Sequence, residues 1–348
     1  MTTSGIKLTS LSHGGGCGCK IAPGVLSQIL KQAPMINLPK ELLAGIDNNE
    51  DAAVYQINEQ QAIVATTDFF MPIVDDPFVF GQIAATNAIS DIYAMGAQPL
   101  FALALLGMPV NVLPVDVIAQ ITAGGAKACA DAGIMIAGGH SIDTVEPIYG
   151  LVVIGIVDPA KLKRNSGAKV GDQIILSKPL GVGILSAAIK QEKISDVAYQ
   201  KMVQLTTQLN KPGLALAALE GVHALTDVTG FGLAGHLLEQ CRGANLSAKI
   251  NWSNLPIIPE AIEYLRVGIV TGASGRNWLG YGHEVTLADE IEQWQKHLLS
   301  DPQTSGGLLV SCAPEATSSV LQTLNEGGFE QACVIGEFTL GNGLFVSK

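Results

Sequence analysis

The stretch His13-Gly14-Gly15-Gly16-Cys17-Gly18-Cys19-Lys20 places the strongest local constraint on how this chain folds. Consecutive glycines weaken both helices and strands, so the stretch is expected to form neither. It also carries two thiols and a cation close together. A flexible glycine segment with Cys17 and Lys20 suits chemistry done by a mobile arm, and we expect the rest of the chain to build the site over which this arm closes.

The length suggests about two domains, and the composition is that of a folded protein with sizeable cores. Of the 348 residues, 48% are hydrophobic and 15% are charged, which is enough for about two cores. The formal net charge of −11 argues against a nucleic-acid partner, because no basic stripe is present to replace phosphate counterions. An acidic chain can still bind a nucleotide by holding divalent cations on its carboxylates.

The sequence gives no sign of a membrane span or a secreted protein. The longest uncharged run, 92–115, is interrupted by prolines and indicates a helix end followed by a buried strand. The first residues, 1–12, lack the apolar core of a signal peptide. Six cysteines are too few for a disulfide scaffold in a chain of this length, so we expect a reducing cytoplasm and no membrane partner.

Strand and helix patterns follow one another along the chain. The periodicity predicts strands over 52–57, 62–67, 100–108, 134–137, 149–157, 173–177, 308–311 and 332–339, and helices over 78–95, 115–132, 183–190, 196–209, 213–220 and 314–326. Asp68 is expected to end a strand, residues 138–141 to form a turn, and the polar stretch 161–172 to mark a domain boundary. This order favours an α+β or mixed α/β fold.

Four aspartates stand where apolar segments meet polar ones: Asp51, Asp68, Asp91 and Asp227. Asp91 lies in an apolar helical pattern four residues after Asn87, so the two share a helix face. Each aspartate alone could be a cap or turn residue. Together, in a chain with few charges, they predict a site for Mg²⁺ shared with substrate phosphates.

The usual phosphate-binding motifs are missing. No Walker-type loop occurs, and the glycines at 181 and 183 lack the third glycine of a dinucleotide fingerprint. Residues 138–141 could present backbone N–H groups to an anion, although strand-end glycines often serve only as turns. His140 alone favours a structural role.

The glycine-rich stretch itself allows several interpretations. Cys17 and Cys19 could form half of a zinc site with His13, or the segment could be a disordered tail. A disulfide between residues two apart would be strained. A nearby Lys20 would favour the thiolate, which makes a nucleophilic or transfer role plausible for Cys17.

Taken together, these motifs resemble the selenophosphate synthetase (selenide, water dikinase) family, within the wider superfamily of aminoimidazole ribonucleotide synthetase-like ATP enzymes. The resemblance covers essentially the whole chain. Its matching stretches are 13–20, 50–55, 66–75, 84–91, 137–143, 225–232 and 301–307. The Gly-Cys-Gly-Cys-Lys sequence is what distinguishes the selenium branch.

The resemblance implies the conversion of ATP, selenide and water into selenophosphate, phosphate and AMP. It implies Cys17 and Lys20 as catalytic residues and Asp51, Asp91 and Asp227 as ligands of several Mg²⁺ ions per ATP, with K⁺ as a candidate monovalent cofactor. The ATP contacts that it implies are Lys20, Asn48, Asn49, Glu50, Asp68, Asp91, Gly139, His140 and Ser141.

The fold implied by the resemblance is α+β with two domains and a mobile arm. Residues 1–46 would form the arm, 47–158 an ATP-binding domain whose mixed sheet dimerises into a barrel, and 168–348 an α/β sandwich domain. The ATP sites of the homodimer would lie near the interface, with loop 139–141 supplied by the partner, and a selenium-delivery protein is a further candidate partner. Alternatives are thiamine-monophosphate kinase, the hydrogenase-maturation carbamoyl dehydratase branch, which relies on a C-terminal cysteine that this chain lacks, and a non-catalytic selenium or metal carrier.

Overall fold

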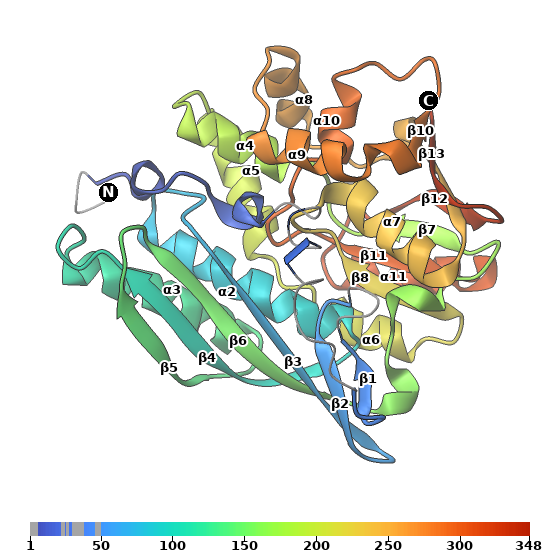
Figure 1. Ribbon diagram of the computed structural model, residues 1–348, viewed down its shortest axis with the longest axis horizontal. Coiled ribbons are helices and arrows are strands. Elements are labelled where there is room, and N and C mark those ends of the chain that lie inside the picture. The colour runs from blue at the N-terminus through green and yellow to red at the C-terminus, as the bar shows by residue number, and fades with distance from the viewer. Residues whose placement is uncertain (1–5, 22–24, 26–27, 30–37, 46–49) are drawn as a thin grey trace.

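The computed structural model describes all residues except 1–5, 22–24, 26–27, 30–37 and 46–49. Most of the described chain is organised around two mixed β-sheets (Figure 1). The first sheet lies in the N-terminal half and the second in the C-terminal half. The α+β class expected from the sequence is therefore confirmed.

The first sheet has the strand order β1-β2-β3-β6-β4-β5. Its strands are β1 Leu42–Ala44, β2 Ala53–Asn58, β3 Gln61–Phe70, β4 Gln98–Met108, β5 Ile136–Asp143 and β6 Ile148–Val157. All neighbours are antiparallel except β4 and β5. Helices α2 Pro77–Ala94 and α3 Val115–Asp131 cover one face of this sheet (Figure 1). The strands β1 and β5 form its two edges.

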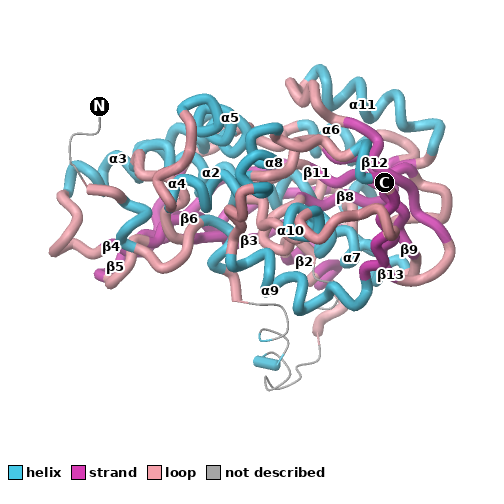
Figure 2. Tube along the Cα trace, turned by 90° about the horizontal axis from the view of Figure 1, so that it is seen from above, coloured by secondary structure: helices cyan, strands magenta, loops and turns pink. Residues whose placement is uncertain are grey.

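The second sheet has the strand order β10-β13-β9-β12-β7-β11-β8. Its strands are β7 Gln173–Leu176, β8 Val222–Asp227, β9 Ser247–Asn251, β10 Val285–Leu287, β11 Leu308–Cys312, β12 Cys333–Thr339 and β13 Gly343–Ser347. The helices of this half, seen in Figure 2, are α4 Val182–Lys190, α5 Asp196–Thr207, α6 Pro212–Ala218, α7 Gly232–Ala244, α8 Pro259–Arg266, α9 Gly272–Tyr281, α10 Gln295–Leu299 and α11 Thr317–Glu326.

Helix α2 joins the two halves because it is buried on nearly all sides. It begins at the cap Asp76, whose side chain accepts a hydrogen bond from the Val79 amide at 2.9 Å. One side packs on the first sheet and α3, and the other contacts α5, α6 and β8. A helix that is apolar all round belongs in a core, and its polar residues therefore need internal partners. No described helix is long and apolar enough to cross a membrane.

Three local expectations from the sequence are wrong. Asp68 does not end a strand, because β3 continues to Phe70 through pairing with β6. Residues 138–141 do not form a turn, because parallel pairing with β4 extends them as part of β5. The stretch Gly16–Cys19 forms one turn of 3₁₀ helix, η2, which a short glycine-containing segment can adopt without the length an α-helix needs.

Candidate active site

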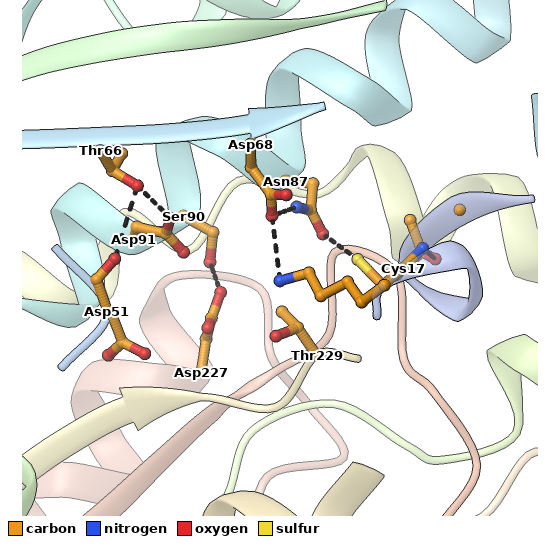
Figure 3. Close-up of polar contacts among 12 residues, drawn as sticks. Cys17, Asp51, Thr66, Asp68, Asn87, Ser90, Asp91, Asp227 and Thr229 are labelled. Atoms are coloured by element: carbon orange, nitrogen blue, oxygen red, sulfur yellow. Dashed lines mark hydrogen bonds and ion pairs between the residues drawn. The ribbon is translucent and has the colours of Figure 1, made fainter. Parts of the chain in front are cut away.

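Three of the predicted aspartates gather where the two halves of the molecule meet. Asp51 precedes β2, Asp91 lies in α2, and Asp227 ends β8. Each carboxylate accepts a hydrogen bond from a hydroxyl: Thr226 Oγ1 donates to Asp51 at 2.8 Å, Thr66 Oγ1 to Asp91 at 2.5 Å, and Ser90 Oγ to Asp227 (Figure 3). The hydroxyls fix the orientation of the carboxylates but supply no positive charge.

Burial and mutual repulsion disfavour the ionised form of this group. Burial, followed by the charge of Asp227, raises the pKa of both Asp51 and Asp91 well above the usual aspartate range. Burial also raises the pKa of Asp227, although the hydrogen bond from Ser90 opposes the shift. Asp51 Oδ2 is buried without a hydrogen-bond partner. A bound cation would favour the ionised form of carboxylates arranged in this way.

The donor set fits a hard divalent cation. Oxygen ligands suit Mg²⁺, which keeps several waters and is usually completed by substrate phosphates. Among the described residues, no three His, Cys, Asp or Glu side chains form a ready-made metal cage. The three carboxylates therefore form an open set of ligands. Phosphate oxygens and water would complete the coordination of a metal ion bound to them.

A chain of contacts leads from Asp68 to the glycine-rich arm. Lys20 Nζ lies 3.6 Å from Asp68 Oδ2, and Asn87 Nδ2 donates to the same oxygen at 2.5 Å. The other end of the Asn87 amide, Oδ1, accepts from the Cys17 thiol at 3.2 Å. In Figure 3, Asp68 and Asn87 lie between the three-aspartate group and Cys17. The predicted catalytic and metal-binding residues therefore adjoin one another.

Lys20 does lower the pKa of the Cys17 thiol, as the sequence predicts, but burial and Asp68 outweigh it. Only 1% of Cys17 is exposed, and burial, followed by the charge of Asp68, raises its pKa well above the usual thiol value. Lys20 offsets only part of this shift. Its own pKa is raised, chiefly by Asp68, so the cation is held by a carboxylate. In this state Cys17 is a thiol that donates to Asn87.

The arm reaches this position because several glycines allow close approach. Gly16 has φ +52°, and a Cβ there would lie 2.3 Å from Thr304 Oγ1. The same hydroxyl accepts from the Cys17 amide at 3.0 Å. A Cβ at Gly230 would lie 2.9 Å from the Lys20 side chain. Residues 13–20 are thus packed in this structure, and the opening of the arm stays a prediction.

The zinc alternative finds no support in the positions of its three candidate ligands. Cys17 Sγ donates to Asn87, while Cys19 Sγ donates to the Gly16 carbonyl at 2.7 Å. His13 is exposed and bonds Glu146. The six cysteines are all free.

Sequence reasoning from residue types missed the loop 301–307 as a supporting element. Ser305, with φ +51°, donates its amide to Asn87 Oδ1 at 2.7 Å. Its carbonyl accepts from buried Lys178 Nζ at 2.8 Å, and Lys178 also donates to the Gln208 carbonyl at 2.7 Å. Burial lowers the pKa of Lys178 to about 7. The loop's glycines and polar residues were a signal, but its contact with Asn87 depends on tertiary structure.

The remaining predicted ATP contacts lie elsewhere or outside the described residues. Glu50 Oε2 accepts from the Asn165 amide at 3.0 Å. Gly139, His140 and Ser141 lie exposed on the edge strand β5, which β4 and β6 separate from the strand β3 that carries Asp68. Asn48 and Asn49 fall outside the described residues.

Comparison with known families covers both halves of the chain. Residues 49–157 match the model of the AIR synthase related protein, N-terminal domain, and residues 169–347 match that of the C-terminal domain. Among solved structures, thiamine-monophosphate kinase from Stenotrophomonas maltophilia K279a superposes with a TM-score of 0.64, covering 94% of this chain and 96% of that one at 21% identity. The hydrogenase maturation protein HypE of E. coli gives a TM-score of 0.62 at 18% identity, covering 83% of this chain and 84% of that one. These two likenesses show the fold alone.

Several relatives of higher sequence identity share one name. The chain is 59% identical to "Selenide, water dikinase" of Paraburkholderia xenovorans (strain LB400), covering 98% of this chain and 97% of the relative. It is 62% identical to the protein of that name from Dechloromonas aromatica (strain RCB), covering 97% of both chains. It is 63% identical to the protein of that name from Pseudomonas straminea, covering 96% of this chain and 94% of the relative. The chain belongs to the selenide, water dikinase family.

Proposed function

We propose that this chain transfers a phosphoryl group from ATP to selenide, with water as the second acceptor, giving selenophosphate, phosphate and AMP. The observation that carries this proposal is the junction of Cys17 and Lys20 with the buried aspartates through Asp68 and Asn87. A thiol suits a soft selenium nucleophile, and carboxylates suit the cations that accompany ATP.

The chain's own residues divide the work of binding. Asp51, Asp91 and Asp227 would hold Mg²⁺. When bound, this ion would neutralise part of the negative charge of the phosphates. Lys20, whose ammonium group already faces a carboxylate, is positioned to attract phosphate oxygens as well. Several Mg²⁺ ions and a K⁺ ion belong to this proposal.

Cys17 and the arm would serve the selenium side of the reaction. The thiol is closed off from solvent at 1% exposure, which protects an easily oxidised nucleophile near it. Selenide must reach Cys17 and water must enter for the second hydrolysis, so the arm has to open during turnover. Packing of residues 13–20 through Thr304 and Asn87 is the closed state in this scheme.

The protein is proposed to act as a homodimer in the cytoplasm. The face of the first sheet opposite α2 exposes apolar side chains, with Tyr55 47%, Ile63 38% and Phe69 52% exposed. Tyr55 and Ile63 are cross-strand partners on that face. A second copy covering this surface would bury it, close a barrel, and bring the partner's 139–141 segment toward the ATP site. Residues 47–158 and 168–348 are the proposed domains, and a selenium-delivery protein is a proposed partner.

An assay separates the enzyme from a carrier. Under anaerobic reducing conditions with ATP, Mg²⁺ and selenide, we expect AMP formation that depends on selenide. A carrier that uses Cys17 and Cys19 would retain selenium and form no AMP. Selenide-independent ATP use, or phosphorylation of thiamine monophosphate, would overturn the proposed reaction.

A further inference from the structure

A cavity of about 280 Å³ lies against the glycine-rich arm. The arm forms one wall through Gly14, Gly15 and Gly18. Helix α4 and the start of α9 contribute further walls, and η2 contacts both β3 and α9. None of Asp51, Asp68, Asp91 and Asp227 lines this cavity. It is therefore separate from the group proposed to hold Mg²⁺.

The charge of the cavity is opposite to that of the protein. The chain has a net charge of −11, yet no aspartate or glutamate is among the residues that line the cavity. Lys190 Nζ donates to the carbonyls of Ser12 and His13 at 2.9 and 3.0 Å. Arg276 Nη2 donates to the Gly18 carbonyl at 3.1 Å. Both cations donate to neutral oxygens here. The charge of Lys190 also lowers the pKa of Glu146, the partner of His13, so Arg276 is the cation whose charge is more fully available to an anion.

The rest of the lining is partly apolar. Pro72, Ile73 and Pro302 contribute to its walls. A lining with two cations and several apolar side chains suits a soft, weakly hydrated anion that carries no metal ion. It suits a strongly hydrated polyphosphate less well, because a polyphosphate needs many hydrogen-bond donors or metal ions.

One residue connects the cavity with the proposed catalytic thiol. Thr304 lines the cavity, and its hydroxyl accepts from the Cys17 amide at 3.0 Å. Thr304 therefore contacts both the cavity and the Cys17 backbone. A shift of the arm would open a direct way from one to the other.

We infer that this cavity receives the selenium substrate, as the hydrogen selenide anion, before it reaches Cys17. The inference rests on the proposed function. Selenide then enters from the α4 and α9 side of the arm and the nucleotide from the aspartate side, so the two anionic substrates do not compete for one entrance.

Ser186 offers a test that leaves the arm's own contacts in place. It lines the cavity from α4 and is half-buried, and none of the described hydrogen bonds of residues 13–20 involves it. In Ser186→Asp, a carboxylate faces Lys190 and Arg276, and we expect the KM for selenide to rise about tenfold. The KM for ATP should stay unchanged. The uncharged variant Ser186→Asn controls for size and should behave like the wild type.

The outcomes distinguish this inference from the proposed function. If the wild type forms no AMP with selenide, the proposed function fails. If the wild type is active and Ser186→Asp has an unchanged KM for selenide, or a raised KM for ATP alone, the cavity is not the selenide entrance. The pair Ala187→Asp and Ala187→Asn, at a neighbouring lining position, repeats the comparison should Ser186→Asp not fold.

Discussion

The Cys17 thiol donates a hydrogen bond to Asn87 Oδ1 over 3.2 Å, in a buried contact between the arm and helix α2. The Asn87 side-chain nitrogen donates to Asp68, and its Oδ1 also accepts a hydrogen bond from the Ser305 backbone amide. A single neutral side chain thus joins the thiol, the lysine's carboxylate partner and the loop 301–307. This contact links the proposed selenium and phosphate sides of the site.

Replacing Cys17 by serine should separate chemistry from folding. A serine hydroxyl can keep the hydrogen bond to Asn87. We therefore expect the free energy of unfolding, measured by thermal denaturation, to change by about 1 kcal/mol or less. Selenophosphate formation should fall to background, while Mg-ATP binding remains. Full activity of Cys17→Ser would remove the thiol from the mechanism.

Two glycines of the arm give a matched comparison. A Cβ at Gly16 would lie 2.3 Å from Thr304 Oγ1, at a positive φ that costs a non-glycine residue about 1–2 kcal/mol. At Gly18 the nearest atom would be 3.5 Å away, which is ordinary contact. Gly16→Ala should therefore displace Cys17 and lower kcat by about a hundredfold.

Gly18→Ala is the control and should stay close to wild-type activity. Alkylation by iodoacetamide provides a second reading, because a displaced Cys17 should react faster in Gly16→Ala. Equal kcat and equal alkylation rates in the two variants would contradict the close docking of the arm.

Asp51→Asn should stabilise the metal-free protein while weakening metal-dependent ATP binding. The folded pKa of Asp51 is raised, so the folded state holds its proton after the unfolded state has released it. Stability conferred by the wild-type residue then falls as pH rises above about 4. In the presence of a chelator, the free energy of unfolding of Asp51→Asn should exceed that of the wild type by an amount that grows with pH to about 1–3 kcal/mol.

With Mg²⁺ and ATP present, the wild type should become more stable than Asp51→Asn, because bound cations neutralise the carboxylates. Denaturant unfolding at several pH values, with chelator and with Mg-ATP, measures the effect. A pH-independent difference between Asp51→Asn and the wild type, or an unchanged affinity for Mg-ATP, would count against Asp51 as a metal ligand.

Lys178 predicts a second pH dependence, of opposite sign. Its folded pKa is about 7, below the ordinary lysine pKa of 10.5, so between these values the unfolded state binds more protons. Stability should therefore rise with pH across that interval. Lys178→Met should remove this contribution and, because the Ser305 carbonyl loses its donor, destabilise the fold by about 1–3 kcal/mol. The measurement is unfolding in urea from pH 7 to 10; an identical pH slope in the two proteins would show that the lysine remains charged.

The sequence predicted most helices and strands because their periodic patterns agree with their burial. It also identified Asp51, Asp68, Asp91 and Asp227, since isolated carboxylates next to apolar segments require partners. The hydroxyl donors Thr66, Ser90 and Thr226 were not predicted, because serine and threonine are common and only tertiary contacts distinguish these ones.

The errors have physical causes that local sequence does not carry. Residues 138–141 read as a turn because of their glycines, but pairing with β4 extends them. Lys20 does lower the pKa of the Cys17 thiol, but the sequence did not reveal that burial and the charge of Asp68 outweigh this effect. Both outcomes depend on segments distant in the sequence.

The most direct test of the account is phosphorus NMR of an anaerobic reaction that contains the protein, ATP, Mg²⁺ and selenium-77-labelled selenide. A phosphorus signal split by selenium should appear together with equal amounts of AMP and phosphate, and it should be absent with Cys17→Ser. AMP formation without a phosphorus–selenium bond, or the same split signal from Cys17→Ser, would contradict the claim that the Cys17 arm and the aspartates form one selenophosphate-producing site.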